Sequence, residues 1–273
     1  MTIHSTDLTM SPAELAFEAE QRGFASLYLP EHTHIPTSRR TPAPTGDEQL
    51  GEEYKRTLDP FVALAAAAER TERILLGTGV ALVAQHDPIV LAKTLATLDV
   101  LSGGRAVLGV GYGWNREEME SHGVDPSQRR AIVREHLLVM GALWSEEVAE
   151  FHGSHVDLEP SWAWPKPVQQ PRIRTLIGGA AGPTLFAQVA ELADGWMPIG
   201  GAGVAAALGD LRQAAEAAGR DPGSIDVVPF GTIPDPGKLE HYREIGIAEV
   251  VLRLPGSGRD EVLPVLDAYG EHL

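Results

Sequence analysis

Cysteine is absent from all 273 residues of this sequence. Its absence excludes disulfide bonds, thiolate nucleophiles and zinc sites with cysteine ligands, and it suits a reducing compartment. Basic side chains are scarce, because 22 lysines and arginines stand against 38 acidic residues and give a formal net charge of -16. No basic run offsets this charge locally, so nucleic acids and anionic membranes would be repelled. We expect neither as a partner.

Long apolar runs are missing as well. The longest ones are far too short to cross a bilayer, and residues 1–10 have neither the basic segment nor the apolar core of a secretion signal. We therefore expect a cytoplasmic protein. What the chain does have is apolar content: 43% hydrophobic residues are enough for one large α/β barrel or for two smaller domains.

Short apolar runs alternate with helical patterns along the chain. The expected strands are residues 2–5, 25–29, 74–80, 106–110, 175–177, 195–198, 226–230 and 249–252. The expected helices are residues 11–22, 59–70, 87–101, 128–144, 185–193, 204–218, 238–245 and 261–269. About eight strand–helix units in a chain of this size predict an α/β fold of the (β/α)8 TIM-barrel type. An open doubly wound sheet is the alternative, but its glycine motif would follow the first strand and not the fourth.

One segment interrupts this rhythm before the fifth strand. Residues 150–171 are rich in proline and carry Trp162 and Trp164. We interpret them as an inserted lid or edge segment, packed near the barrel mouth or at a dimer contact. Residues 1–273 are accordingly predicted to form a single domain.

The fourth strand leads into the most informative stretch, residues 102–123. Glycine occupies alternate positions at Gly109, Gly111 and Gly113, and Asn115 follows. Glycines here would let the backbone approach a flat or phosphorylated ligand, with free N–H groups facing it. A flexible strand end with no ligand is the alternative, because a glycine-rich turn by itself is a weak signal.

A second glycine-rich turn follows the fifth strand. It contains Gly178 and Gly179 and leads into a helix at Thr184. Backbone N–H groups at a helix start can hold a phosphate, with the Thr184 hydroxyl beside it. The alternative is that these glycines only close tight turns.

Glu31 and His32 follow the second strand, and barrel active sites are assembled from the carboxyl ends of strands. A histidine there suits proton transfer or a hydrogen bond to a bound ring; a surface histidine at the start of a loop is the alternative. His32 and His34 form an H-x-H pair that could hold a metal, but a catalytic zinc needs about three protein ligands. The later strand ends supply none, so no metal site is predicted.

Four stretches of the sequence, in the order in which they occur, resemble the luciferase-like monooxygenase superfamily. They are LPEHTHIP (29–36), DPFVALAAAAERTERILLGTGV (59–80), DPIVLAKTLATLDVLSGGRAVLGVGYGWNREEM (87–119) and ADGWMP (193–198). The likeness runs from about residue 11 to residue 198, and it is greatest to the branch of probable oxidoreductases that depend on the deazaflavin coenzyme F420. It implies a barrel that binds its cofactor at the carboxyl-end mouth, usually as a homodimer.

This resemblance also implies roles for residues. Thr78, Gly79 and Val80 match a bulge with a non-proline cis peptide bond behind the cofactor ring. The two glycine-rich turns match regions that contact the side chain and phosphate of the cofactor. Glu31 and His32 match a pair beside the ring, where His32 would move a proton or orient the ring and Glu31 would hold the ring or His32.

The implied activity is hydride transfer between coenzyme F420 and a small organic substrate that the sequence does not name. An FMN-dependent monooxygenase on the same fold is the nearest alternative, and a protein that binds the cofactor without turnover is another. Tyr112 stands where relatives that oxidise sugar phosphates carry a glutamate, so that substrate class is not expected. The polyglutamate tail of F420 needs basic partners in this acidic protein. Candidates are Arg39, Arg40, Lys166, Arg172 and Arg174.

Overall fold

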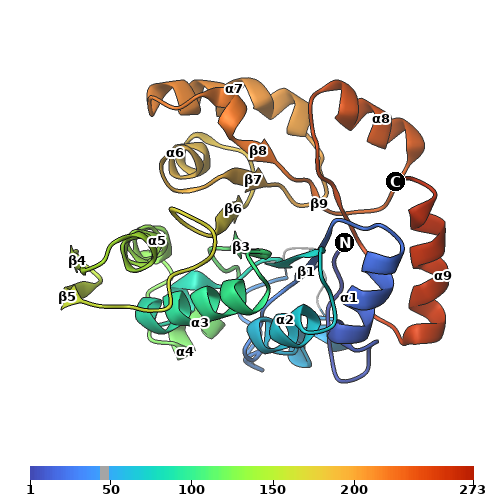
Figure 1. Ribbon diagram of the computed structural model, residues 1–273, viewed down its shortest axis with the longest axis horizontal. Helices are drawn as coiled ribbons and strands as arrows, with labels where there is room; N and C mark the ends of the chain where they lie inside the picture. Colours follow the sequence, from blue (N-terminus) through green and yellow to red (C-terminus); the bar gives the residue numbers. More distant parts are fainter. Residues whose placement is uncertain (44–48) are drawn as a thin grey trace.

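The structure is a computed structural model that describes residues 1–43 and 49–273. Helices surround a central set of strands (Figure 1). The helices are α1 (Pro12–Gln21), α2 (Pro60–Ala68), α3 (Pro88–Leu101), α4 (Arg116–Ser121), α5 (Arg129–Ser145), α6 (Pro183–Leu192), α7 (Val204–Ala217), α8 (Pro236–Glu244) and α9 (Arg259–Gly270), with 3-10 turns η1 (Glu52–Lys55), η2 (Val83–Gln85) and η3 (Pro222–Ser224). The strands are β1 (Ser26–Leu29), β2 (Leu75–Thr78), β3 (Ala106–Val110), β4 (Ala149–His152), β5 (Asp157–Ser161), β6 (Arg174–Gly178), β7 (Gly195–Met197), β8 (Asp226–Val227), β9 (Phe230–Thr232) and β10 (Val251–Leu252).

The strands form a parallel ring. Six of them pair in the order β1-β2-β3-β6-β7-β8, and β9 pairs in parallel with β10. Thr2 joins the two ends, because it bridges Tyr28 of β1 on one side and Arg253, just after β10, on the other. Its N–H donates to the carbonyl of Leu252 (2.8 Å), and its carbonyl accepts from Leu254 (2.9 Å). The prediction of an α/β barrel is thus confirmed, although the first strand is shorter than residues 2–5.

Two apolar layers hold the barrel together. Inside it, side chains from several strands pack on each other, among them Tyr28, Val107, Leu176, Met197 and Val251. Outside it, a larger layer lies between the strands and the helices. A stripe of apolar side chains on α5 belongs to that layer and is buried throughout: Val133, Leu137, Met140 and Trp144.

Helix starts follow the sequence signals only in part. Asp59 caps α2 by accepting from Val62, and Asp87 caps α3 by accepting from Ile89 and Val90, each ahead of a proline. At α1, the residue before the helix, Ser11, makes no capping bond with its side chain. The helix still begins where predicted, because a proline at its first position fixes the backbone there.

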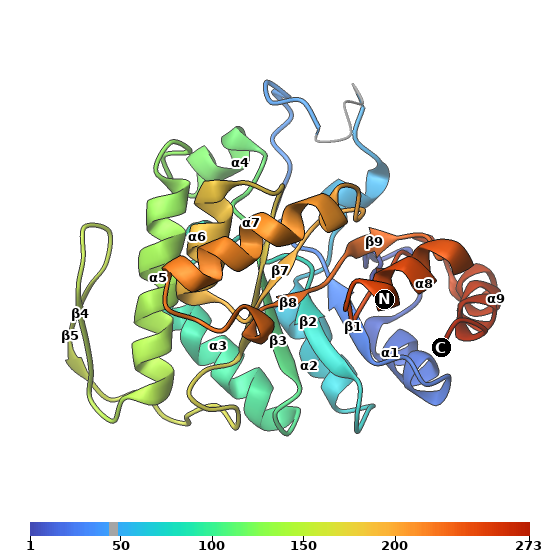
Figure 2. The same cartoon turned by 90° about the horizontal axis from the view of Figure 1, so that it is seen from above.

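The segment before β6 contains an antiparallel hairpin, β4 and β5. It runs along the outer side of α5 and away from the barrel mouth (Figure 2). The carboxylate of Glu135 on α5 holds its turn by accepting from the N–H groups of residues 154–156 at 2.7 to 3.1 Å. The expected lid position is therefore not observed. Beyond the hairpin, Trp162 and Trp164 are 78% and 62% exposed.

Candidate functional site at the barrel mouth

The segment that follows β1 and the helix α4 that follows β3 lie at the same end of the barrel (Figure 2). This is the carboxyl end of the strands, where barrel proteins place their sites. His32 lies there, just after β1. Its Nδ1 is 2.9 Å from Oε2 of Glu118 on α4, and the N–H of Thr33 donates to the other oxygen of that carboxylate at 3.2 Å.

Both members of the His32–Glu118 pair are shielded from water, with side chains 8% and 1% exposed. A carboxylate only accepts hydrogen bonds, so Nδ1 of His32 is assigned the hydrogen. This bond fixes the plane of the imidazole and leaves Nε2 as the atom for chemistry. Nε2 makes no hydrogen bond to any of the described residues. The pair therefore presents an oriented group that can accept or donate a proton.

Aromatic rings surround this histidine. The ring centroid of Tyr54 lies 5.4 Å from that of His32, and Trp114 lies edge-on at 5.9 Å. His4 extends the wall, because its ring is 5.1 Å from Tyr54. Burial lowers the pKa of His4, nearby Glu53 raises it, and His32 and Arg253 lower it further. Rings from separate segments thus form an apolar wall suited to a flat conjugated ligand.

Glu31 has a different set of partners from the one expected. One of its oxygens accepts from the N–H of Leu82 at 2.6 Å, and the other is 2.7 Å from Nε2 of His86. Burial by itself would lower the pKa of His86, but the bond to Glu31 raises it overall. Glu31 thus anchors the segment after β2, while the hydrogen bond to His32 comes from Glu118.

The peptide bond between Gly79 and Val80 is cis, as the resemblance implies. Thr78 precedes this bond, and its hydroxyl is hydrogen-bonded within the sheet. The hydroxyl donates to the carbonyl of Gly109 (2.8 Å) and accepts from the N–H of Gly109 (3.0 Å). A Cβ on Gly109 would lie 2.0 Å from the Thr78 carbonyl oxygen. Gly109 therefore lets β3 approach this bulge, and Thr78 is fully buried. Neither presents a side-chain group to the mouth.

Two further glycines make room for Val80. A Cβ on Gly111 would lie 2.4 Å from Cγ2 of Val80, and a Cβ on Gly178 would lie 3.2 Å from its Cγ1. Val80 itself is only partly buried. The valine is thus seated between two glycines, and it forms an apolar floor at the carboxyl ends of β2, β3 and β6.

The remaining predicted residues differ in exposure. Gly113 adopts a positive φ of 76°, a conformation that favours glycine. Asn115 is buried and caps α4 through a long contact, 3.5 Å, from the N–H of Glu118. The indole N–H of Trp196 on β7 donates to the carbonyl of Gly179 at 2.9 Å. Thr184 is exposed in the first turn of α6, where no side chain caps the helix.

Several buried polar atoms near the mouth have no hydrogen-bond partner among the described residues. They are Nδ1 of His4, Oγ of Ser5, Nδ2 of Asn115 and Oγ1 of Thr232. All four residues lie at or beyond the carboxyl end of a barrel strand. A buried polar atom without a partner costs about 1–3 kcal/mol. A ligand with hydrogen-bonding groups at its edges would satisfy these atoms.

Comparison with known proteins places this chain in a family. The profile of the luciferase-like monooxygenases matches residues 11–233. The chain belongs to the luciferase-like monooxygenase family. An uncharacterized protein of Mycobacterium tuberculosis (strain ATCC 25618 / H37Rv) is 44% identical over 276 residues, which cover 100% of this chain and 96% of that protein.

Other relatives carry named activities. The F420-dependent glucose-6-phosphate dehydrogenase of Kineococcus radiotolerans is 31% identical over 221 residues, 78% of this chain and 60% of that protein. Among solved structures, an F420-dependent secondary alcohol dehydrogenase with an F420–acetone adduct has a TM-score of 0.77 at 18% identity, covering 100% of this chain and 97% of that one. Monooxygenase RslO1 from Streptomyces bottropensis has a TM-score of 0.76 at 23% identity, covering 96% and 92%. At such identities the structures show the shared fold.

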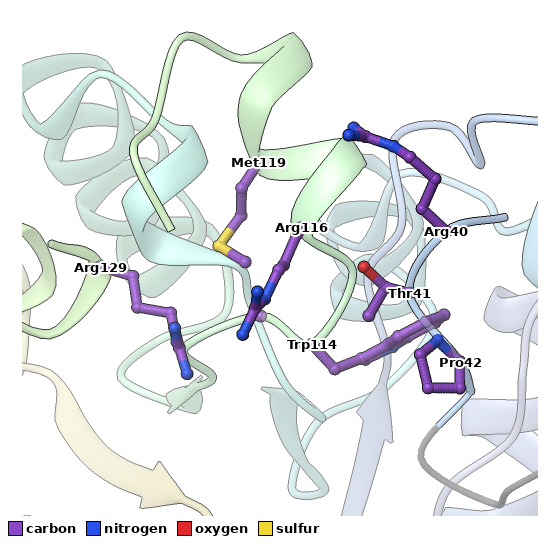
Figure 3. A pocket seen from close by; sticks show the side chains of 8 residues that line it. Arg40, Thr41, Pro42, Trp114, Arg116, Met119 and Arg129 are labelled. Carbon is purple, nitrogen blue, oxygen red and sulfur yellow. The ribbon is translucent and has the colours of Figure 1, made fainter. Parts of the chain in front are cut away.

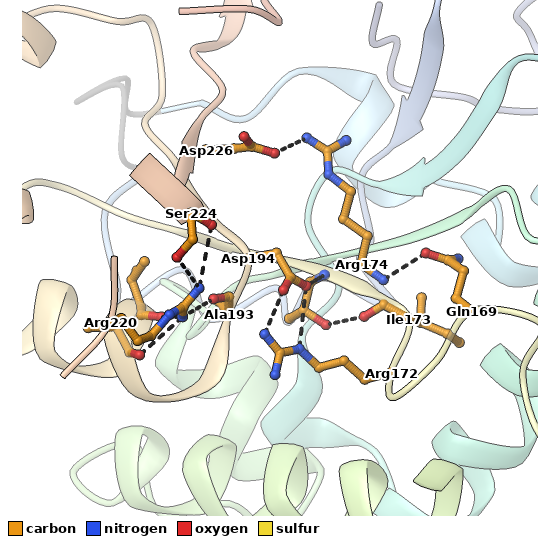
Figure 4. Close-up of polar contacts among 12 residues, drawn as sticks. Gln169, Arg172, Ile173, Arg174, Ala193, Asp194, Arg220, Ser224 and Asp226 are labelled. Carbon is orange, nitrogen blue, oxygen red and sulfur yellow. Dashed lines mark hydrogen bonds and ion pairs between the residues drawn. The ribbon is translucent and has the colours of Figure 1, made fainter. Parts of the chain in front are cut away.

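Two of the candidate basic groups of this luciferase-like protein lie at the opposite end of the barrel (Figure 4). Arg172 pairs with Asp194 at 2.6 Å, and Arg174, the first residue of β6, pairs with Asp226 and Glu249 at 2.9 and 3.0 Å. The amino ends of parallel strands point away from the mouth. The expectation that these arginines serve an anionic cofactor tail is therefore wrong, because their charges are matched within the protein.

The other basic candidates lie at both ends of the barrel. Lys166 donates to the main-chain carbonyl of Leu143 at 2.9 Å, near the end of α5, so it also lies away from the mouth. Arg39 is at the mouth, with its guanidinium carbon 5.7 Å from the ring centroid of Trp114. Arg40 follows it and lines a cavity that includes the same tryptophan.

Glu118, Tyr54 and Trp114 were missed as site residues. The spacing of Asn115 and Glu118 is that of a helix cap and its third residue, and it could have placed Glu118 at the mouth. No pattern marks Tyr54, which lies in the 3-10 turn η1. Within residues 1–43 and 49–273, no cluster of three or more potential metal ligands is found, and no helix is long and apolar enough to cross a membrane.

Proposed function

We propose that this protein is an oxidoreductase that uses coenzyme F420 with an organic substrate still to be identified. The observation that carries the proposal is the shielded His32–Glu118 pair, which lies at the same end of the barrel as the floor formed by Val80. An oriented proton-transfer group beside a wall of aromatic rings suits chemistry on a flat redox ring. Relatives named as F420-dependent, in sequence and in fold, support this choice of cofactor.

The residues present fit such a ring. Val80 would support one face of it, and Tyr54 and Trp114 would shield it from water. The unpartnered amide of Asn115 offers a donor to its edge. The open first turn of α6, with the Thr184 hydroxyl, offers N–H groups to a phosphate. When bound, the deazaflavin supplies the two-electron hydride chemistry, and the protein supplies binding and orientation.

The chain's own contribution is proton handling at Nε2 of His32. Glu118 holds the hydrogen on Nδ1, so Nε2 can accept a proton from a substrate hydroxyl or return one to a carbonyl. The adjacent carboxylate stabilises the imidazolium that forms when Nε2 takes up the proton. Glu118 is thus a positioning residue, and His32 is the candidate catalytic residue.

Tyr112 argues against carrying over the sugar-phosphate substrate of some relatives. Its hydroxyl donates to Gln188 at 2.5 Å, and the guanidinium carbon of Arg130 lies 4.4 Å from its ring centroid. Burial raises the pKa of Tyr112 to about 12. The residue is therefore a neutral phenol at neutral pH, and it cannot replace a carboxylate as a base. Small alcohols or carbonyl compounds suit this mouth better.

A second candidate is an FMN-dependent monooxygenase, which the fold likeness to RslO1 favours.

We also propose a homodimer in which residues 150–171, as an insertion before the fifth barrel strand, contribute to the contact. The exposed Trp162 and Trp164 of this segment and its Val168, which is 57% exposed, support the proposal.

The deciding experiment is fluorescence titration of the purified protein with F420 and with FMN in parallel. We expect tighter binding of F420, followed by bleaching or recovery of its absorbance when a panel of alcohols and carbonyl compounds is added. Submicromolar FMN binding with no measurable F420 binding would overturn the cofactor. Binding of F420 without turnover by any member of the panel would favour a carrier protein.

A further inference from the structure

A cavity adjoins the His32 site, and three arginines line it. We call it the arginine pocket; its wall includes Arg40, Thr41, Gly113, Trp114, Arg116 and Arg129 (Figure 3). Its volume is about 370 Å³, which falls in the range of roughly 300 to 1,000 Å³ typical of small-molecule sites. Trp114 belongs to both sites, since its ring also packs edge-on against His32. A ligand in the mouth could therefore extend past Trp114 into the pocket.

The charges in this pocket are poorly matched by the protein. In Figure 3 the guanidinium groups of Arg116 and Arg129 point to the same side, while Arg40 lies on the opposite rim, beyond Thr41. Arg116 makes no ion pair or hydrogen bond with any described residue. Arg129 donates to the carbonyl of Pro126 at 2.5 Å, but its Nε is buried without a partner in the described chain. Two neighbouring cations without a counter-ion favour binding of an anion.

Of the three arginines, Arg40 is the only one that meets carboxylates among the described residues. It pairs with Glu120 at 2.6 Å, and its Nε is 3.7 Å from Glu117. The carboxylate of Glu117 is hydrogen-bonded to Thr41, because it accepts from the N–H of Thr41 at 2.8 Å and from the Thr41 hydroxyl. These bonds fix the rim of the pocket to α4. The carboxylate of Glu117 is thus part of the wall and does not neutralise Arg116 or Arg129.

The acidic surface of the protein limits anion binding to this pocket. The protein carries a formal net charge of -16, so free anions are repelled over most of its surface. A pocket with unpaired guanidinium groups is then a local exception. Guanidinium groups bind carboxylates in a planar, two-point geometry, and a chain of carboxylates can use more than one of them.

We propose that the arginine pocket binds the γ-linked glutamate carboxylates of the F420 tail, a subsite that rests on the proposed function. The tail would leave the mouth past Trp114 and meet Arg116 and Arg129. This assignment replaces Arg172, Arg174 and Lys166 as the basic partners of the tail. It also explains how an acidic protein can hold a polyanionic coenzyme.

The test compares two coenzyme forms on three proteins. The probes are F420 with several glutamates and the same coenzyme with none, and the proteins are wild type, Arg116→Ala and the control Arg212→Ala. Arg212 is exposed on α7 and makes no hydrogen bond or ion pair with any described residue. We expect Arg116→Ala to weaken binding of the glutamylated form about 10-fold, the loss of one charge-assisted bond. Binding of the tail-free form should stay within about twofold, and Arg212→Ala should match wild type for both.

A second measurement keeps the pocket testable without the ring. Free tri-γ-glutamate is titrated into the protein by calorimetry at low salt, with Arg116→Glu as the charge-reversed variant. We expect weak binding that Arg116→Glu and high salt abolish. If neither coenzyme form binds but the peptide does, the proposed function fails and the pocket stands. Equal affinity of the two coenzyme forms in wild type, or equal losses for both in Arg116→Ala, would overturn the tail assignment.

Discussion

Replacing His32 or Glu118 tests whether the shielded pair carries the chemistry. His32→Ala removes the proton-transfer group, and we expect turnover to fall by roughly 10²- to 10⁴-fold, the usual range for a general acid or base. Coenzyme affinity should change much less, because the group acts mainly in the transition state. His34→Ala is the matched control, since His34 is exposed and its partners are Thr33 and the ring of His122.

Glu118→Gln probes the positioning role in the same pair. The carboxylate accepts two hydrogen bonds, from His32 and Thr33, while an amide side chain offers one oxygen and a donor. One charge-assisted bond is lost, which should cost about 2 kcal/mol of stability. Turnover should fall about 10- to 100-fold, as when a residue that orients a reacting group is lost. The substitution should also shift the pH profile of kcat, which a purely structural change would not do.

The assay is single-turnover oxidation or reduction of the bound ring, followed by its absorbance, with a substrate from the panel above. Urea unfolding of the same variants separates lost stability from lost rate. Equal single-turnover rates in wild type and His32→Ala would refute the reasoning and remove His32 from the mechanism. A rate loss in Glu118→Gln with an unchanged pH profile would reduce Glu118 to a structural anchor.

Three further outcomes follow from packing, charge and exposure. Gly111→Ala should destabilise the fold by about 1–3 kcal/mol, because its Cβ would meet a valine methyl at 2.4 Å; Gly141→Ala, with open space around it, should be neutral or stabilising in the same thermal melt. Burial would raise the pKa of Glu117, but the hydrogen bonds that its carboxylate accepts lower this pKa from 4.5 to about 2. The ionised carboxylate therefore stabilises the fold fully above about pH 4.5, and this stabilisation is lost as the pH falls toward 2. Glu117→Gln should therefore cost up to about 3 kcal/mol in urea unfolding at pH 7 and much less at pH 3; an equal cost at both would contradict this. If residues 150–171 form a dimer contact, Trp162→Ser with Trp164→Ser should convert a dimer to a monomer in light scattering, and an unchanged mass would exclude that contact.

The sequence predicts the scaffold better than the site. Strand β3 has the predicted bounds, 106–110, and Asp87 caps α3 as its pattern indicates. These features depend on local chemistry, since a buried parallel strand needs a short apolar run and a helix start needs an acceptor. The first strand could not be bounded in the same way, because only Thr2 of residues 2–5 pairs with both neighbours.

The glycines show why the site was harder. Gly109, Gly111 and Gly178 are predicted to contact a cofactor, and in the structure each also makes room for the bulge that contains the cis bond. A glycine in the sequence shows that space is needed beside the backbone, but it does not show whether a ligand or a neighbouring residue fills that space. Glu118 was missed for a related reason, since its partner His32 is 86 residues away in the chain and spacing cannot show that contact.

The short seam at Met1 and Thr2 links the stability of the barrel to occupancy of its mouth. A strand joined to its neighbours through so few residues should open at a lower free energy than the rest of the ring. His4 and Ser5 lie two and three residues after Thr2, so each opening would withdraw two polar groups from the mouth. A ligand that uses those groups binds only the closed ring and therefore favours closure by mass action. Slower amide exchange at Leu254, whose N–H donates to Thr2, would then report ligand binding from the far side of the seam.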